Sequence, residues 1–261
     1  MNFILSVLLG SIISLVSYHL RLLNLKGAIA TFVLAVIIFT LGSWKWTIPI
    51  LSFFILSSLL SKIRKKMNPG VNSVFQRGDE RDHVQVLANG GFPGIIILIN
   101  QIHTTELFYI AYVSAVAAAC SDTWATEIGT LINTKTFNII NFNPVEQGIS
   151  GGVSLLGFIG ALLGALIITV SALPWLNINY ELFLIILASG VFASVFDSIL
   201  GSTYQVKYTC MVCDKTIENK FHCGKNTVHA KGVKWLDNDA VNFAASLFGG
   251  LMPLAVTSLI L

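Results

Sequence analysis

Eight apolar segments follow one another along this chain, near residues 3–20, 27–43, 46–61, 90–102, 107–131, 151–173, 182–204 and 239–261. Most are close to the ~20 residues that a helix needs to cross the hydrocarbon core of a bilayer. Only 11% of the residues are charged, whereas a typical soluble domain has about 25%. We therefore predict an all-α, polytopic transmembrane helical bundle that forms a single integral membrane domain over residues 1–261.

The segment 90–102 is the exception, because it is short and begins with Gly90-Gly91-Phe92-Pro93-Gly94. Proline and glycine interrupt helices, and non-helical backbone at membrane depth is tolerated only where protein or a wet cavity surrounds it. We expect this segment to be broken or re-entrant, so that the bundle has about seven to eight membrane segments.

Basic residues lie almost entirely in the polar loops that eight crossings would place on one side of the membrane. The loops 62–83 and 205–238 carry most of them, and Lys45 is the only basic residue predicted for the other side. By the positive-inside rule, the basic side is cytoplasmic. We therefore predict cytoplasmic loops near 62–88, 132–150 and 205–238, the last of them rich in cysteine. The modest net charge of +3 gives no reason to expect a nucleic acid partner.

Acidic side chains end two of the apolar segments on that same side. Asp122 and Glu127 follow one apolar run, and Asp197 ends another in a similar way. A charge at membrane depth is costly, so it usually faces a cavity and has a function. In a regular helix Glu127 lies about 140° around the axis from Asp122, so ligands from another helix are needed to complete an ion site. We interpret these acids as part of a metal-assisted site; the alternative is that they are interfacial residues at helix ends.

A dense polar run over residues 77–90 leads directly into an apolar segment. Arg77 and Arg81 lie about one helical turn apart, and their planar guanidinium groups suit two-point binding of phosphate oxygens. Gln85 and Asn89 continue the same helical face. The alternative interpretation is a solvated stretch beside the membrane with internal ion pairs.

Two further motifs precede membrane segments. Gly151 and Gly152 belong to a glycine-rich turn whose backbone N–H groups suit an anion, although small residues also serve helix packing. Asp237, Asp239 and Asn242 lie where the last segment begins. Helix N-capping explains such residues, but the excess of acids favours a metal or nucleotide role.

The loop 205–238 contains a candidate zinc site. Cys210 and Cys213 form a Cys-x2-Cys half-site, and His222 with Cys223 offers two more ligands. The second pair lacks the usual spacing. A structural zinc ion and reduced, unliganded cytoplasmic thiols are the two interpretations.

Taken as an ordered set, these motifs resemble the phytyl-phosphate kinase family of integral membrane proteins. The resemblance covers nearly the whole chain and rests on Arg81-Asp82-x-x-Gln85-Val86-Leu87-Ala88-Asn89-Gly90, Asp122-Thr123-Trp124-Ala125-Thr126-Glu127-Ile128-Gly129, Gly151-Gly152-Val153-Ser154, Asp197-Ser198-x-x-Gly201, the cysteine loop 208–225 and Asp237-Asn238-Asp239-x-Val241-Asn242. It implies a membrane kinase that converts a prenyl monophosphate, such as phytyl phosphate, into the diphosphate. The family is distantly similar to dolichol and phytol kinases, which favour CTP.

Phosphoryl transfer requires charge neutralisation, positioning and Mg²⁺, and the residues fit these needs. As catalytic residues we expect Asp122, Glu127, Arg81 and Asp197. As Mg²⁺ ligands we expect Asp122, Asp197, Asp237 and Asp239. As nucleotide or phosphate ligands we expect Arg77, Asp82, Gln85, Asn89, Gly151, Gly152, Lys231 and Asn242. The implied partners are a nucleoside triphosphate and a prenyl-phosphate lipid, with the site facing the cytoplasm.

Two other classes stay open. A cytidylyltransferase-like membrane enzyme would use similar groups but release pyrophosphate. A lipid or small-solute transporter is favoured by a faint internal repeat and by the interrupted segment. A transporter, however, predicts polar residues spread through the membrane midplane, whereas the acids here collect at one interface.

Overall fold

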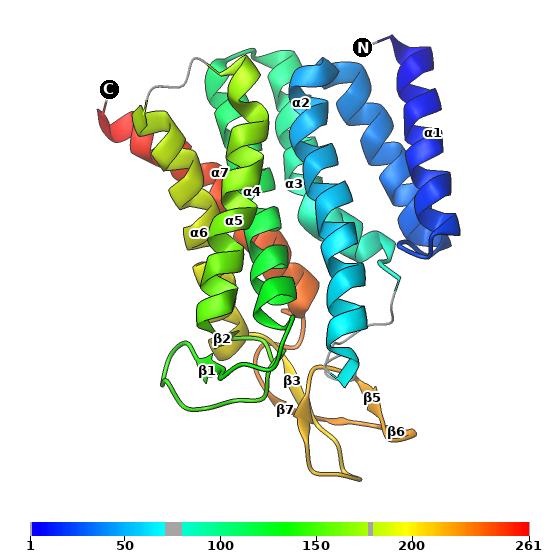
Figure 1. Cartoon of the computed structure of the whole chain (residues 1–261), viewed down its shortest axis with the longest axis vertical. Helices are drawn as coiled ribbons and strands as arrows, with labels where there is room; N and C mark the ends of the chain where they lie inside the picture. The colour runs from blue at the N-terminus through cyan, green and yellow to red at the C-terminus, as the bar shows by residue number, and fades with distance from the viewer. Residues whose placement is uncertain (1, 71–79, 177–179, 261) are drawn as a thin grey trace.

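The computed structural model of the chain describes residues 2–70, 80–176 and 180–260. Helices dominate this part and pack side by side as a bundle (Figure 1): α1 (Phe3–His19), α2 (Leu25–Met67), α3 (His83–Ile102), α4 (Glu106–Gly129), α5 (Leu155–Ala172), α6 (Tyr180–Thr203) and α7 (Asn238–Ile260). Six of them are long and apolar enough to cross a membrane, and α1 is a shorter apolar helix. The predicted polytopic helical membrane bundle is confirmed.

Helix α2 consists of two membrane segments joined at a sharp bend. Ser43 has non-helical backbone angles, φ 55° and ψ −165°, and the limbs 25–42 and 44–67 run in opposite directions (Figure 1). The Thr47 hydroxyl donates to the Ser43 carbonyl oxygen at 2.8 Å just after the bend. This bend separates the two apolar segments predicted at 27–43 and 46–61.

Helix α3 differs from the sequence-based expectation. It runs without interruption from His83 to Ile102 although it contains Pro93, so the predicted break near 90–102 is absent from it. A capping box fixes its start: the Asp82 side chain accepts from the Gln85 N–H, and the Gln85 side chain accepts from the Asp82 N–H. The polar residues 83–88, predicted as loop, are therefore helical, as are residues 62–67 at the end of α2. Hydropathy misses such polar helix ends.

Helix α4 is the centre of the bundle. It contacts α2, α3, α5, α6 and α7, and its side chains from Tyr112 to Ala118 are fully buried. Small residues allow close contacts with α5: a Cβ atom at Gly164 of α5 would lie 2.7 Å from the Cys120 carbonyl oxygen. Small residues serve the same purpose in other membrane helix pairs. The polar end of α4 consequently lies where several helices meet.

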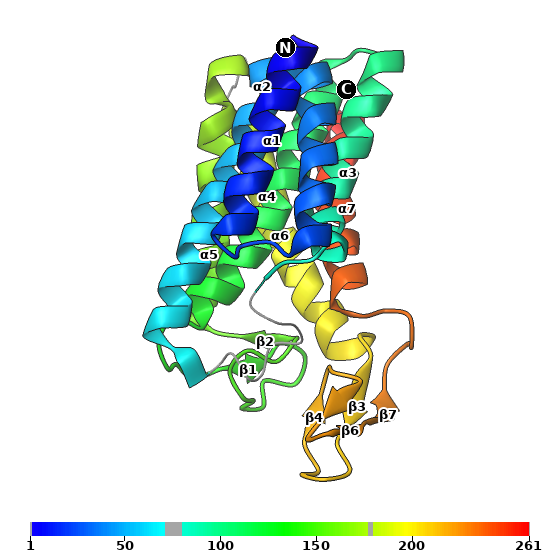
Figure 2. The ribbon, with the colours of Figure 1, turned by 90° about the vertical axis from the view of Figure 1, so that its right-hand side faces the viewer.

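Short strands and loops gather at one end of the bundle (Figures 1 and 2). Strand β1 (Phe137–Asn138) pairs with β2 (Gly152–Val153), and β5 (Phe221–His222) pairs with β6 (Lys225–Asn226). Strands β4 (Thr216–Ile217), β3 (Lys207–Thr209) and β7 (Val228–Lys231) form a three-stranded antiparallel sheet. A 3₁₀ turn, η2 (Leu173–Trp175), follows α5.

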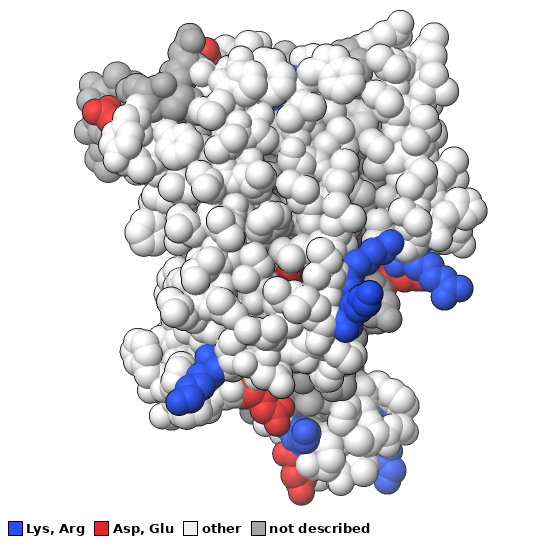
Figure 3. Space-filling model, viewed as in Figure 1, with Lys and Arg blue, Asp and Glu red and all other residues white. Residues whose placement is uncertain are grey.

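Most Lys and Arg side chains visible in Figure 3 lie toward the end of the bundle that carries the strands. The loops after α1, α4 and α6 all lie at the ends of their helices that point toward the strands (Figures 1 and 2), as the distribution of basic residues predicted. That this end faces the cytoplasm stays a prediction.

Candidate active site

A cavity of about 600 Å³ lies among the helices at the end that carries the strands. This volume is in the range of small-molecule sites. Residues of α2, α3, α4, α5, α6 and α7 line it, together with the loop before α5. Its acidic lining residues are Glu80, Asp122, Glu127, Asp197, Glu218 and Asp239. Its basic lining residues are Arg21, Lys62, Arg64, Lys65 and Arg81.

The cavity brings together most of the residues predicted from sequence: Arg81, Gln85, Asn89, Asp122, Glu127, Gly151, Gly152, Asp197, Asp239 and Asn242. Three others lie outside its lining. Asp82 caps α3, Asp237 accepts from the Ala240 N–H at 3.1 Å where α7 begins, and Lys231 is exposed on β7. Arg77 lies outside the described residues.

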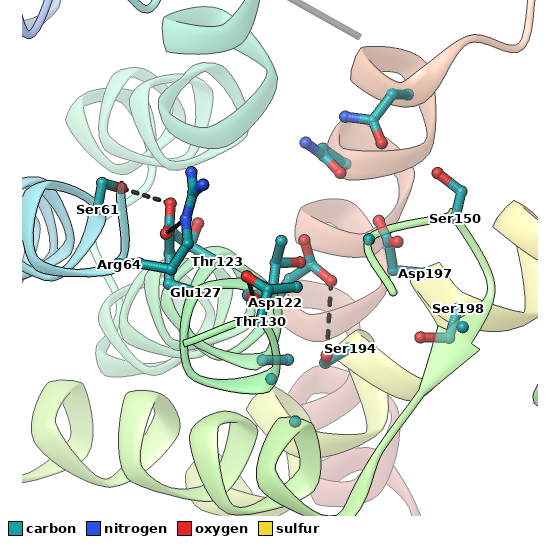
Figure 4. A pocket seen from close by; sticks show the side chains of 18 of the residues that line it. Ser61, Arg64, Asp122, Thr123, Glu127, Thr130, Ser150, Ser194, Asp197 and Ser198 are labelled. Atoms are coloured by element: carbon teal, nitrogen blue, oxygen red, sulfur yellow. Dashed lines mark hydrogen bonds and ion pairs between the residues drawn. The ribbon is translucent and has the colours of Figure 1, made fainter. Parts of the chain in front are cut away.

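Asp122 of α4 and Asp197 of α6 face the same cavity from neighbouring helices (Figure 4). The Ser194 hydroxyl donates to Asp122 Oδ1 at 3.5 Å. The Asn242 amide, in the orientation that satisfies its hydrogen bonds, donates to Asp197 Oδ2 at 3.0 Å. These bonds hold one oxygen of each carboxylate. Within the described part of the chain the second oxygen of each carboxylate accepts no hydrogen bond, so both can face a cation.

The cavity acids do not form a closed cage of three carboxylates. Among the described residues, one group of three or more His, Cys, Asp or Glu side chains has ligand atoms within 4.8 Å of one another, and it is the cysteine cluster of the loop 205–238. Mg²⁺ does not require such a cage, because it is usually bound by one or two carboxylates together with phosphate oxygens and water. Asp122 and Asp197 supply the hard oxygen ligands for that kind of site.

Glu127 has a different environment from Asp122. Arg64 Nε donates to Glu127 Oε2 at 2.9 Å, and the Ser61 hydroxyl donates to Oε1 (Figure 4). The side chains of Arg64 and Glu127 are only 4% and 12% exposed. Glu127 therefore belongs to a buried ion pair that joins α4 to the second limb of α2. Arg64 was predicted only as one of the basic residues of the loop 62–83, since a contact across 63 positions leaves no local signal in the sequence.

The backbone of Arg81 is fixed against the turn between α1 and α2. Its N–H donates to the Leu22 carbonyl at 3.0 Å, and its own carbonyl accepts from the Asn24 N–H at 3.1 Å. Gly27 packs directly on that carbonyl, with no space for a side chain. Burial lowers the pKa of the Arg81 guanidinium, and the nearby Glu127 carboxylate opposes this effect. Since a guanidinium remains protonated in proteins, Arg81 supplies a fixed positive charge in the cavity wall.

The glycine-rich turn before α5 packs tightly against the end of α6. Gly151 has φ +84°, and a Cβ atom there would lie 2.6 Å from the Ser202 Cα. The Gly152 N–H donates to the Ile149 carbonyl at 2.9 Å, and the Ser150 N–H donates to Glu218 Oε1 at 3.1 Å. Two N–H groups of this turn therefore have protein partners, and close packing explains Gly151.

Two residues after α6, Gln205 and Lys207, hold this turn in place, and neither was predicted to belong to the site. Lys207 Nζ donates to the Ser150 carbonyl at 3.0 Å, and the Gln205 amide donates to the Ser150 hydroxyl at 3.0 Å. Burial lowers the pKa of Lys207, with Glu218 opposing and Lys231 adding to the effect. The loop that carries the cysteines is thus tied to the cavity wall.

The four candidate zinc ligands come together as predicted. Cys210 and Cys213 lie at the turn between β3 and β4, while His222 and Cys223 lie in the β5–β6 hairpin. The Sγ atoms of Cys213 and Cys223 lie 3.6 Å and 3.1 Å from His222 Nδ1. Hydrogen bonding with His222 lowers the pKa of Cys210 to about 6, whereas burial raises the pKa of Cys223 to about 11. Three thiols and an imidazole at these distances can bind a metal such as zinc.

The fold and this site define a class: polytopic helical membrane proteins with a charged cavity at one end of the bundle. The match of the integral membrane protein family DUF92 to residues 8–250 makes the assignment specific. The chain belongs to the DUF92 family.

Related proteins cover nearly the whole chain. Protein PGR of Arabidopsis thaliana is 29% identical over 269 residues, which cover 94% of this chain and 92% of the relative. An uncharacterized membrane protein of Methanocaldococcus jannaschii is 28% identical over 253 residues, covering 95% and 91%. Protein VTE6, chloroplastic, of Arabidopsis thaliana is 22% identical over 246 residues, covering 92% and 66%. No solved structure matches the chain.

Proposed function

We propose that this protein is a membrane-embedded isoprenoid-phosphate kinase. It transfers a phosphoryl group from a nucleoside triphosphate, with CTP favoured, to a prenyl monophosphate such as phytyl phosphate. The observation that carries the proposal is the cavity in which Asp122, Asp197 and the guanidinium of Arg81 line one polar space at the end of an apolar bundle. The resemblance of the ordered motifs to phytyl-phosphate kinases supports the same reaction.

The chemistry of the cavity suits phosphoryl transfer, which depends on positioning and electrostatic stabilisation more than on covalent catalysis. The acceptor is already a phosphate, so its oxygen is ionised at neutral pH and needs no general base. In the described part of the chain, neither histidine nor cysteine lines the cavity. A phosphate acceptor is compatible with such a lining, because it requires neither side chain as a base.

The residues divide into two groups under this proposal. Asp122 and Asp197 would hold Mg²⁺, with Asp239 beside them in the lining, and the ion would neutralise charge on the phosphates. Arg81 would bind a phosphate through its planar guanidinium. Lys62, Lys65 and Arg21 add positive charge to the same wall. Glu127 would act through Arg64, holding α2 against α4.

The reaction is tested by following two labels on one nucleotide. Purified protein is incubated with Mg²⁺, phytyl phosphate and CTP that is radiolabelled at either the γ- or the α-phosphate. A kinase transfers only the γ label to the lipid and forms a prenyl diphosphate. Transfer of the α label with release of pyrophosphate would contradict the proposal in favour of nucleotidyl transfer. If no nucleotide yields a lipid product with prenyl phosphates of several lengths, the proposal is wrong and transport is favoured.

Asp122→Asn tests the metal assignment, because it keeps the size of the side chain and removes its charge. Turnover should fall roughly a hundredfold, the scale for losing one preorganised electrostatic group. Glu146→Gln is the matched control: it removes a carboxylate that lies outside the cavity lining, is 63% exposed and pairs with Lys215 at 3.8 Å. Normal turnover of folded Asp122→Asn would refute the role of Asp122.

Arg81→Lys tests phosphate binding by geometry rather than by charge. An ammonium group cannot reproduce the two-point contact of a guanidinium with phosphate, so activity should fall strongly although the charge remains. Arg81→Ala should lose more. Equal activity of wild type and Arg81→Lys would make Arg81 a general source of positive charge.

We also propose a structural Zn²⁺ ion at Cys210, Cys213, His222 and Cys223. Four protein ligands would fill a tetrahedral site and leave no position for substrate. Metal analysis of the purified protein should find about one zinc ion per chain, and Cys213→Ser should lose it. Cys120→Ala, which removes a buried thiol of α4, should retain it. A zinc-free preparation with full activity would contradict the proposal.

A further inference from the structure

A second, smaller pocket of about 70 Å³ lies directly beside the charged cavity. It is lined by α1, both limbs of α2 and α3, and it is mainly apolar: its wall includes Ile13, Leu34, Ile38, Phe39, Phe53 and Phe54. Three residues, Arg81, Gln85 and Asn89, line both the cavity and this pocket. The two spaces therefore meet at a fixed positive charge.

The apolar pocket extends away from Arg81 into the membrane part of the bundle. Its residues on the first limb of α2 run from Thr31 to Phe39, a distance of about 12 Å along the helix. This limb begins beside Arg81, whose carbonyl packs on Gly27, and ends at the bend at Ser43. Phe39, at the far end of the pocket, is only 1% exposed. A hydrocarbon tail that enters beside Arg81 would thus be surrounded by apolar side chains, which are most buried toward the bend at Ser43.

Close packing of α3 on α2 shapes one wall of the pocket. A Cβ atom at Gly90 would lie 2.5 Å from Leu34 Cδ2, and one at Gly94 would lie 2.8 Å from Leu34 Cδ1. These two glycines let α3 approach Leu34, and the Gln85–Asn89 turn of α3 then lies at the boundary between the polar and apolar spaces. The Asn89 side-chain amide donates to the Gln85 carbonyl at 3.0 Å, which orders that boundary.

We infer that this apolar pocket binds the isoprenoid tail of the lipid substrate. The phosphate end lies in the charged cavity against Arg81. The first isoprene unit lies at the boundary beside Gln85 and Asn89. The following unit lies between Leu34, Ala35 and Phe54. A neutral solute would not interact favourably with the Arg81 cation, and a nucleotide would not complement the apolar wall. An amphiphile with one anionic end complements both the cation and the apolar wall. The inference rests on the proposed function for the identity of the lipid, but the binding can be measured without turnover.

Photoaffinity labelling tests the location of the tail. The probe is a farnesyl monophosphate analogue with a diazirine at the end of its chain, applied to the full-length protein in lipid nanodiscs. Mass spectrometry should place the crosslinks within residues 31–39 and 50–54, and unlabelled phytyl phosphate should suppress them. Crosslinks confined to other helices would overturn the inference. Equal labelling by the corresponding neutral alcohol would do so as well, because it would identify a general lipid crevice without a phosphate anchor.

Ala35→Leu tests whether the pocket selects for chain length. Ala35 lines the pocket and is 8% exposed, so a larger side chain fills space that the tail needs. The KM for phytyl phosphate should rise roughly tenfold or more, the scale for extra methylene groups in an apolar site. The KM for dimethylallyl phosphate, with a single isoprene unit, should stay unchanged. Val33→Phe on the same limb, at a position that is 49% exposed, should change neither value.

The outcomes separate the two proposals. Crosslinks in the pocket without any prenyl diphosphate formed would refute the kinase and leave the tail site standing. Diphosphate formation with crosslinks elsewhere would refute the tail site alone. An equal rise in the KM values for phytyl phosphate and dimethylallyl phosphate in Ala35→Leu would also count against the tail site. It would show that the substitution disturbs the whole cavity.

Discussion

Removing one partner of the Arg64–Glu127 ion pair should destabilise the bundle more than removing both. The two side chains are 4% and 12% exposed, and their N–O distance is 2.9 Å. A single substitution removes the ion-pair partner of a charge that stays buried, which typically costs about 3 to 5 kcal/mol. Neutral residues at both positions are often tolerated with little loss.

The matched variants are Glu127→Gln, Arg64→Met and the double variant. Glu127→Gln keeps an oxygen that can accept from Ser61, so its effect reports mainly on the lost charge. A chain of this size loses roughly 2 to 4 °C of melting temperature per kcal/mol, so each single variant should melt roughly 6 to 20 °C lower. The double variant should melt closer to wild type. Thermal unfolding in detergent, followed by tryptophan fluorescence, measures all three.

An exposed pair provides the internal control. Lys215 and Glu146 are more than 60% exposed and 3.8 Å apart, so breaking that pair should cost about 1 kcal/mol or less. A Glu127→Gln protein with the melting temperature of wild type would refute the buried ion pair. The same variants also separate stability from chemistry: a stable but inactive double variant would assign a direct role in the reaction to Glu127 or Arg64.

Three further predictions concern the cavity wall and the topology. Asp197→Asn should lower turnover roughly a hundredfold while tail crosslinking persists; unchanged turnover would remove Asp197 from the proposed metal site. Gly151→Ala should lower the melting temperature, because φ is +84° and the new Cβ would lie 2.6 Å from the Ser202 Cα; no change would contradict that close approach. Cysteines placed at Lys65 and Lys225 should resist an impermeant maleimide in intact cells, and labelling of either would put the cavity on the outer side.

The architecture was predictable because the length and hydropathy of each segment report directly on lipid exposure. The bend at Ser43 was predictable as a gap between two apolar runs. The start of α3 was not, because Asp82 and Gln85 build a polar first turn that hydropathy assigns to a loop. The uninterrupted course of α3 through Pro93 was also missed, since tertiary packing offsets the local preference of proline to break a helix.

The candidate site was predictable where a carboxylate sits in an apolar helix, as at Asp122 and Asp197. Its supporting contacts were not predictable, because they join distant segments. The bond from the Ser150 N–H to Glu218 spans 68 positions, and Arg64 reaches Glu127 across 63. Neither Glu218 nor Arg64 is distinguished from the residues next to it in the sequence. Only the packing of α2 and of the loop after α6 shows what these charges face.

The position of the charged cavity at one end of the bundle has a consequence for where the lipid is used. In the proposed reaction, nucleotide and prenyl phosphate both have to approach that face, so the reaction would serve a single leaflet. A phosphate or diphosphate head group crosses hydrocarbon only at high cost, and the product would therefore stay in the leaflet from which the substrate came. Under the proposed function, prenyl phosphate in the opposite leaflet would be inaccessible until a separate process moved it across, and the supply of substrate would depend on that process as well as on synthesis.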